Sequence, residues 1–395
     1  MSNKQFLQNT IEYLKNNIDF IPPKNSTDVL IQYIKPFIKP DSHILEPFAK
    51  TGEFIHQLYK LDISFNLTIL EENIELFNNI TDTYPNVSNS FNTSLLKLSK
   101  PHNFKKFDII IGAPPSKLID KKTSIGNSFR HWFVDNTDLY SLYFMRSIDL
   151  LNPDGIIAFI IPDSIFNSPN IQMLRNKISI QGNIIHLQRL SNLFTKTTYN
   201  TVLIVFQKNK NDNNDKYKFI ANNNPFFHIN TKIYKDIFKY ATFLSNLNVK
   251  ITKGHIPRNI DNRTKNRKGI PILYTKNIDF DYTLKLYDNN KQYIDSKFLD
   301  TPIIQKPSLI FSKFYGTNED EFQIKCALCT LEKYICNDNL FVVTFPQLNN
   351  DESVILIYKI IKSIQSDKTK PWQNIFLKNG IITKYQIKYY LPLFI

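Results

Sequence analysis

The chain has few cysteines, few glycines and no long apolar run. Its 395 residues include 3 cysteines (Cys326, Cys329 and Cys336) and 9 glycines. A structural zinc site takes about four ligands at suitable spacing, and no fourth ligand accompanies these cysteines. We therefore interpret them as reduced structural residues. No signal peptide and no apolar run of the ~18 residues that a membrane helix needs is present, which predicts a soluble intracellular protein.

Composition and charge indicate a globular protein with an anionic partner. Hydrophobic residues make up 42% of the chain and charged residues 21%, proportions typical of a folded protein rather than a disordered one. The length suggests two or three domains. The formal net charge of +14 favours a polyanionic partner, although a lysine-rich composition that serves only solubility would give the same charge.

In the first half of the chain apolar strands alternate with helical segments, which predicts an α/β fold with a parallel sheet. Helices are expected to start at Gly52 and near Asn73, and to cover 138–151 and 168–178. A short loop separates the last two strands, so the last strand is predicted to be an antiparallel partner at the sheet edge. The strands are expected at 43–47, 67–71, 107–112, 155–162, 183–190 and 201–207.

A polar, charged segment at 207–218 marks the expected domain boundary. Beyond it the pattern is irregular, with short apolar runs and helices expected at 231–247 and 351–366. We therefore predict a first domain over 1–207, a linker over 208–224 and a second domain over 225–395.

Three strand ends carry the residues that suggest a ligand site. "ILEPFAKTGEF" (44–54) takes a strand through Glu46 into a tight turn and a helix, and "TILEEN" places Glu71 and Glu72 at the end of the next strand. "FDIIIGAPPSK" (107–117) runs a strand into a double-proline turn that fixes the direction of the Pro114 carbonyl. Ligands of α/β sheets bind outside the carboxyl ends of the strands, so we expect these segments to form one site.

With these motifs in this order, the chain resembles the gamma-class adenine-specific DNA methyltransferases over nearly its whole length. Further segments that resemble the family are "FIPPKNSTDVLIQYI" (20–34), residues 138–178, "LFTKTTYNTVLIVFQK" and the short motifs of the second half. The resemblance implies a Rossmann-like methyltransferase domain with a seven-stranded, mostly parallel sheet, followed by a mixed α+β target-recognition domain. It also implies S-adenosylmethionine as cofactor, DNA as partner and the N6 amine of adenine as methyl acceptor.

The resemblance assigns roles to residues of this chain. For the catalytic turn it implies Ala113, Pro114, Pro115 and Ser116. For cofactor binding it implies Pro23, Glu46, Pro47, Phe48, Thr51, Gly52, Glu71 and Glu72. It implies Phe194 as an aromatic wall of the target-base pocket, and within the recognition domain the basic stretch 253–269 is the candidate for DNA contacts, through Lys253, Arg258, Arg263, Lys265, Arg267 and Lys268. A solvated charged loop would have the same composition.

At four positions the chain departs from the family pattern. Ala113 stands where the family has a side-chain hydrogen-bond acceptor, and Ser116 stands where it has an aromatic residue that stacks on the extruded adenine. Losing one transition-state hydrogen bond costs ~10²–10³ in rate, and losing a stacking platform costs about 1–3 kcal/mol. Lys50 replaces a loop glycine, and only Thr93 or Ser94 occupies the place of an acidic residue that binds the cofactor's adenine. The departures predict weak or lost methyl transfer.

Three functions fit these observations. The first is an active N6-adenine DNA methyltransferase. The second is a catalytically inactive relative that binds DNA, as a specificity subunit of a larger protein complex. The third is a methyltransferase that acts on RNA or on a protein side-chain amide, which the resemblance of the second half to a DNA-recognition domain disfavours.

Overall fold

The computed structural model describes residues 24–98, 106–133, 136–190, 200–209, 216–256, 268–287, 292–299, 302–314, 323–377 and 380–395. The chain divides into two compact units. The amino-terminal unit comprises Met1–Phe219 and Asn224–Thr231, and the carboxy-terminal unit comprises Ile220–Asn223 and Lys232–Ile395. The functional boundaries expected from the sequence, with a linker over 208–224, stay a prediction.

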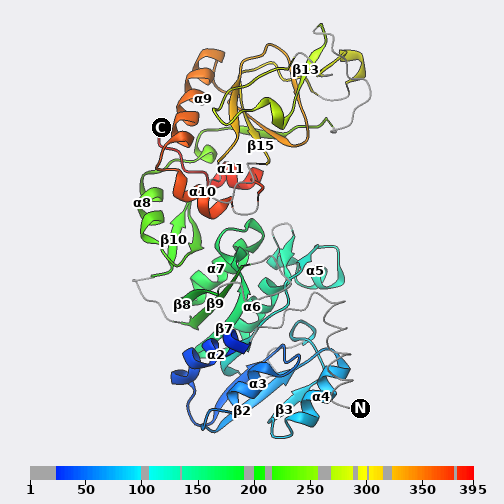
Figure 1. Cartoon of the computed structure of the whole chain (residues 1–395), viewed down its shortest axis with the longest axis vertical. Helices are drawn as coiled ribbons and strands as arrows, with labels where there is room; N and C mark the ends of the chain where they lie inside the picture. The colour runs from blue at the N-terminus through cyan, green and yellow to red at the C-terminus, as the bar shows by residue number, and fades with distance from the viewer. Residues whose placement is uncertain are drawn as a thin grey trace. The chain divides into compact units, whose positions relative to one another are not determined.

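The amino-terminal unit is built on a seven-stranded sheet in the order β3-β2-β1-β4-β7-β9-β8 (Figure 1). The neighbouring pairs among β1, β2, β3, β4 and β7 are parallel, and β9 is antiparallel to both β7 and β8. The predicted seven-stranded, mostly parallel sheet is thus confirmed. The strands are β1 (Ser42–Glu46), β2 (Phe65–Leu70), β3 (Asn89–Phe91), β4 (Phe107–Gly112), β7 (Leu151–Pro162), β8 (Gly182–Leu190) and β9 (Thr201–Lys208).

The position of β9 differs from the expectation. This strand is antiparallel as predicted, but it lies between β7 and β8, so that β8 forms the sheet edge. β9 is buried along six consecutive residues, which is the pattern of a strand covered on both faces rather than of an edge.

Helices cover both faces of this sheet. The even-numbered residues Ile156, Ala158 and Ile160 of β7 pack in one apolar cluster with α2 (Lys24–Ile34), α3 (Glu53–Leu58) and α4 (Ile74–Thr83). The odd-numbered Ile157, Phe159 and Ile161 pack in a second cluster with α6 (Leu139–Leu150) and α7 (Gln172–Gln181). Because successive side chains of a strand point to opposite faces, a doubly covered sheet needs apolar residues at every position.

Short elements complete the unit. β5 (Leu118–Ile119) pairs with β6 (Thr137–Asp138) beside the short helix α5 (Ser124–Ser128). β10 (Lys218–Ala221), whose last two residues belong to the carboxy-terminal unit, pairs with β11 (Asn224–Phe227) in a two-stranded sheet.

Among its described residues, the carboxy-terminal unit contains two small sheets and four α-helices (Figure 1). One sheet is antiparallel, with β12 (Lys250–Lys253), β18 (Leu340–Thr344), β15 (Ser308–Ser312) and β16 (Cys326–Cys329) in that order. The other joins β14 (Tyr293–Ile294), β13 (Ile270–Leu273) and β17 (Ile335–Cys336). The helices are α8 (Lys232–Tyr240), α9 (Asn350–Gln365), α10 (Lys370–Phe376) and α11 (Lys384–Tyr389). The mixed α+β architecture expected for the second domain is confirmed.

The three cysteines lie in the small sheets. Cys326 and Cys329 are in β16 and Cys336 is in β17, and all three are buried free thiols. Burial raises the pKa of the Cys329 thiol to about 11. Within the described part of the chain, no helix has the length and apolar character needed to cross a bilayer.

Candidate active site

The loop after β1 (residues 47–52) is held in place by backbone hydrogen bonds and by one carboxylate. The Ala49 amide donates to the Leu70 carbonyl at the end of β2 (3.1 Å), and the Lys50 amide donates to the Glu71 carboxylate (2.8 Å). The other oxygen of that carboxylate accepts the Asn73 amide at 2.8 Å. The Glu71 carboxylate therefore links the loop after β1 to the end of β2. Its role in binding the hydroxyls of a ribose stays a prediction.

Gly52 closes this loop where the chain enters α3. Its φ of +82° lies in the left-handed region, and its amide donates to the Ala49 carbonyl at 2.7 Å. An added Cβ would lie 2.9 Å from the Tyr84 ring. Both the conformation and the space favour glycine here. Thr51, beside it, donates from its hydroxyl to the Glu53 carboxylate.

Glu46, the last residue of β1, carries a fully buried carboxylate. Its side chain is 0% exposed, and neither oxygen has a hydrogen-bond partner among the described residues. Burial raises the pKa of this carboxyl well above its usual range, and the nearby Glu53 and Glu71 raise it further, whereas Lys50 acts in the opposite direction. A buried acid without a hydrogen-bond partner is costly, so Glu46 is a candidate functional group.

Lys50 has an unusual backbone and a buried side chain. Its φ of +48° is in the left-handed region, which agrees with the glycine that the family pattern has at this position. The side chain is buried, and Nζ donates a hydrogen bond to the Ala113 carbonyl at 3.2 Å. The loop after β1 and the proline turn after β4 are thus connected directly by this ammonium group.

The proline turn begins at Gly112, whose φ is +151° and whose added Cβ would lie 2.9 Å from the Phe48 ring. Ala113 follows with 2% exposure and Pro114 is buried, whereas Pro115 and Ser116 are half-buried. Phe48 therefore packs against the strand end that carries the turn.

Ser116 is bound to a neighbouring helix cap. Its hydroxyl donates to the two carboxylate oxygens of Asp138, both at 3.0 Å, and the Lys117 amide donates to the same carboxylate at 3.1 Å. Asp138 is the N-cap of α6 and accepts the Tyr140 amide. Burial raises the pKa of Asp138, while the Ser116 hydrogen bond acts to lower it. The hydroxyl of Ser116 thus fixes the turn to α6 in the place where the family has an aromatic ring.

A pocket of about 330 Å³ opens where these elements meet. It is lined by Phe48 and Lys50 from the first loop, by Glu71 and Glu72 from the second strand end, and by Pro115 from the turn. The sequence-predicted segments from three strand ends are therefore brought together. The other lining residues are Pro47, Asn73, Leu76, Thr93, Ser94 and Tyr143. The predicted residues Glu46, Thr51, Gly52, Ala113, Pro114 and Ser116 are not among the lining residues.

Tyr143 of α6 is a lining residue that the sequence reasoning did not single out. Its ring packs edge-on against Phe48 with centroids 4.7 Å apart, and its hydroxyl is hydrogen-bonded to Ser94 at 2.9 Å. In the sequence, Tyr143 is distinguished only by its position within residues 138–178, a segment that resembles the methyltransferase family. The half-exposed Glu72 forms an ion pair with Lys97 at the pocket.

The lining residues fit an adenosyl ligand with an amino-acid tail. The Phe48 and Tyr143 rings offer apolar faces, and Glu72 and Ser94 offer polar groups that can meet hydroxyls or ring nitrogens. Glu46 does not line the pocket, but it directly precedes the lining residue Pro47, and its carboxylate has no partner among the described residues. The residue set therefore suits S-adenosylmethionine, with Lys50 as an added positive charge.

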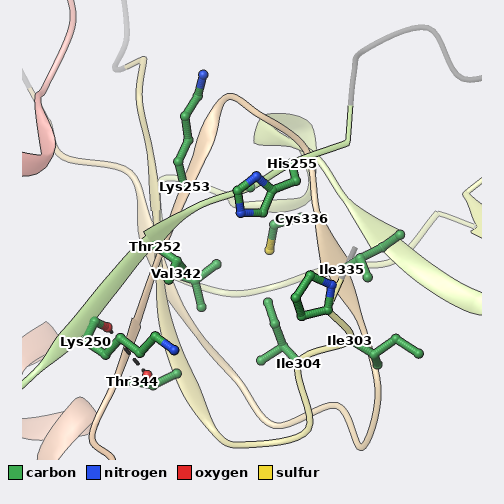
Figure 2. Close-up of a pocket in the computed structure, with 12 residues that line it drawn as sticks. Lys250, Thr252, Lys253, His255, Ile303, Ile304, Ile335, Cys336, Val342 and Thr344 are labelled. Atoms are coloured by element: carbon green, nitrogen blue, oxygen red, sulfur yellow. Dashed lines mark hydrogen bonds between the residues drawn. The ribbon is translucent and has the colours of Figure 1, made fainter. Parts of the chain in front are cut away.

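A second pocket, of about 230 Å³, lies in the carboxy-terminal unit (Figure 2). Its lining combines apolar residues such as Ile303, Ile304 and Val342 with Lys250, Lys253 and His255. Figure 2 shows Lys253 extending away from the apolar residues. Gly254, between the two basic residues, is required because an added Cβ would lie 2.0 Å from the Asn337 carbonyl oxygen.

The structure describes only part of the predicted DNA-contact set. Lys253 ends β12 and is exposed, and Lys268 lies in the exposed turn before β13. The remaining predicted contacts, Phe194, Arg258, Arg263, Lys265 and Arg267, lie outside the described residues, as does the predicted cofactor residue Pro23.

Comparison with known proteins shows similarity to restriction-modification methylases. Residues 53–194 match the model of the family described as Eco57I restriction-modification methylase. Modification methylase CviBIII of Paramecium bursaria Chlorella virus NC1A is 23% identical over 385 residues, which cover 95% of this chain and 93% of that protein. Type II methyltransferase M.HincII of Haemophilus influenzae is 24% identical over 375 residues, covering 89% of this chain and 69% of that protein.

Among solved structures, the type IIG restriction endonuclease BpuSI is similar over 93% of this chain and 58% of its own, at 10% identity and a TM-score of 0.45. The chain is similar to restriction-modification methylases over residues 53–194, which hold most of the residues that line the pocket, and to modification methylase CviBIII over 95% of its length.

Proposed function

We propose that the chain is a DNA methyltransferase of the restriction-modification type that transfers a methyl group from S-adenosylmethionine to the N6 amine of adenine. The observation that carries the proposal is the pocket at which the loop after β1, the end of β2 and the proline turn after β4 meet. The match of residues 53–194 to a restriction-modification methylase family supports it.

The bound cofactor supplies an electrophilic methyl group, and the chain's own residues position the groups around it. Phe48, Tyr143 and Pro115 exclude water from one side of the pocket. The Pro114 carbonyl, fixed by two consecutive prolines, accepts a hydrogen bond from the adenine amine and raises the electron density on its nitrogen. The adenine reaches this turn only after extrusion from the duplex.

A catalytically inactive DNA-binding protein is the second candidate function. It is favoured by three features of the turn. Ala113 has no side-chain hydrogen-bond acceptor, and its backbone carbonyl accepts a hydrogen bond from the Lys50 ammonium group. The Ser116 hydroxyl donates a hydrogen bond to the Asp138 carboxylate. An acceptor and a stacking face are therefore both missing, at a combined cost of roughly three to five orders of magnitude in rate.

One assay separates these two functions. The purified chain is incubated with tritium-labelled S-adenosylmethionine and duplex DNA of mixed sequence, and incorporated label is counted and located in the hydrolysed nucleosides. Label in N6-methyladenine at ordinary turnover rates supports the enzyme. DNA binding without incorporation supports the inactive protein, and label in cytosine would contradict the proposed acceptor.

A rescue variant tests the assigned defect. In the inactive case, Ala113→Asn with Ser116→Tyr restores the acceptor and the stacking face together. Both groups act on the same extruded base, so the double variant should gain more rate than the two single variants combined. If the gain in rate of the double variant equals the combined gains of the two single variants, the two positions do not act on the same extruded base.

A further inference from the structure

One wall of the pocket in the carboxy-terminal unit is a face of the β12–β18 strand pair (Figure 2). In the antiparallel register Lys250 lies opposite Thr344 and Thr252 lies opposite Val342, and all four residues line the pocket. Residues two apart on a strand point to the same face of a sheet. This wall is therefore a regular sheet surface, which holds its side chains more precisely than a loop does.

The interior of the pocket is aliphatic. Ile304 is anchored to the strand that follows it in the small sheet, because its amide and carbonyl exchange hydrogen bonds of 2.9 and 3.1 Å with Tyr334. Cys336 of β17, which is 3% exposed, also lines the pocket. Figure 2 shows the side chains of Val342, Ile304 and Cys336 gathered in the middle of the pocket. An apolar body can therefore be bound there.

Basic side chains lie toward the two ends of this apolar interior. Lys250 and Lys253 are the first and last residues of β12, about 10 Å apart along the strand, and His255 follows. All three are exposed. The described residues that line the pocket include no acid. Asp338 approaches the His255 end, since its amide donates to the Ile256 carbonyl at 3.0 Å, but it is not a lining residue.

This arrangement selects among anionic ligands. A fatty acid or another single carboxylate has one charged end, whereas the pocket has ammonium groups toward both of its ends. A nucleotide within a DNA strand has a phosphate on each side of its sugar and a ring that an apolar pocket can hold. In paired DNA the faces of that ring are covered by the neighbouring base pairs, so the ring must leave the stack before it can insert.

We infer that this pocket binds one unpaired nucleotide of DNA, with the base among the aliphatic residues and its flanking phosphates near Lys250 and Lys253. The inference rests on the proposed function, which makes DNA the partner. Extrusion of an adenine leaves the opposite thymine without a partner, so the proposed reaction itself creates an unpaired nucleotide. The carboxy-terminal unit thus has a place for a base that is separate from the methyl-transfer turn.

The test is fluorescence anisotropy of the full-length chain with two labelled duplexes. One duplex is fully paired, and the other has the same sequence with one unpaired thymidine added at its centre. The measured quantity is Kd for the paired duplex divided by Kd for the duplex with the unpaired thymidine. We expect a ratio of about ten or more in the wild type, the gain in affinity that one bound base typically gives in single-stranded complexes.

Two variants alter the pocket and one serves as a control. Thr252→Trp fills the pocket from a half-buried position of β12, and tryptophan is well tolerated in strands, so the ratio should fall to about one while the paired duplex still binds. Lys250→Gln should lower the ratio and reduce the salt slope of the unpaired complex by about 0.7–0.9. Ile355→Trp adds the same ring at a 58% exposed position of α9 and should keep the wild-type ratio. Thermal unfolding checks each fold, and Lys250→Gln carries the test if Thr252→Trp is unstable.

The outcomes separate the inference from the proposed function. If the wild type binds both duplexes equally, or if its preference survives in both Thr252→Trp and Lys250→Gln, the pocket does not hold an unpaired nucleotide, and the inference is wrong while the proposed function stands. If the wild type binds neither duplex, DNA is not the partner, and the proposed function fails together with the inference.

Discussion

At the residue scale, the polar groups of the site differ in whether they already form hydrogen bonds within the protein. The Ser116 hydroxyl is bound to Asp138 and the Glu71 carboxylate to two backbone amides, so both residues hold the framework together. Glu46 differs, because its buried oxygens have no partner among the described residues. The sequence indicates that these residues gather at one sheet edge, but it does not show which of them are already engaged.

The buried Glu46 carboxyl predicts a pH-dependent stability. Burial raises the pKa of this group well above its usual value, so at intermediate pH the folded state keeps a proton that the unfolded state has lost. The free energy of unfolding that Glu46 contributes is therefore full below the unfolded pKa of about 4.3 and falls as the pH rises toward the folded pKa. Glu46→Gln has no ionisable group at this position, so this fall in the free energy of unfolding with rising pH is absent in the variant.

The measurement is denaturant unfolding of the wild type and Glu46→Gln between pH 4 and pH 7. Relative to the wild type, the variant should gain about 1 kcal/mol or more over this range. Glu75→Gln, which removes an exposed carboxylate of α4, controls for the loss of one negative charge. A stability difference between Glu46→Gln and wild type that does not change with pH would contradict the assignment.

At the element scale, the close approach of β8 and β9 depends on a glycine. An added Cβ at Gly182, the first residue of β8, would lie 2.0 Å from the Gln207 carbonyl oxygen and 2.8 Å from the Phe206 ring. Gly182→Ala must push the strands apart, and overpacking of this kind typically costs about 1–3 kcal/mol. Denaturant unfolding measures the loss, with Ile180→Ala at a 79% exposed position as the control. Equal stability of the two variants would contradict this reading of the strand pair.

The same scale shows what the sequence could predict. Strands such as β4 and β7 are recognisable because they are apolar on both faces, and α6 begins at its N-cap Asp138. β3 is not recognisable from its residues, because Asn89, Ser90 and Phe91 are all exposed at the sheet edge. Only the family resemblance implied a seventh strand. The position of β9 between β7 and β8 could not be predicted either, because the local sequence of a strand does not determine which strands it pairs with.

The candidate site was predictable in its segments and less so in its contacts. The three strand-end motifs meet at one pocket because carboxyl ends of parallel strands share an edge. Tyr143, contributed by α6, and the hydrogen bond from Lys50 to Ala113 arise from tertiary packing. The spacing of residues along the sequence predicts neither the position of Tyr143 at the pocket nor this hydrogen bond.

At the scale of the whole molecule, the net charge of +14 makes DNA a fitting partner. Lys250, Lys253 and His255 line the pocket of the carboxy-terminal unit, and the last two belong to the basic stretch 253–269. We propose that this basic stretch, residues 253–269, provides the main phosphate contacts. A charged loop that only aids solubility would add no salt-dependent affinity.

Replacing Arg258, Arg263 and Arg267 together by alanine tests this proposal. Each lost phosphate contact should reduce the slope of log K against log salt concentration by about 0.9, so three lost contacts weaken binding most at low salt. Fluorescence anisotropy with a labelled duplex at several salt concentrations measures both affinity and slope. A matched variant with Lys359, Lys362 and Lys368 replaced by alanine removes the same charge from exposed positions at and just after α9. If both triple variants lower affinity and slope equally, the effect is one of net charge, and the basic stretch has no special role in DNA binding.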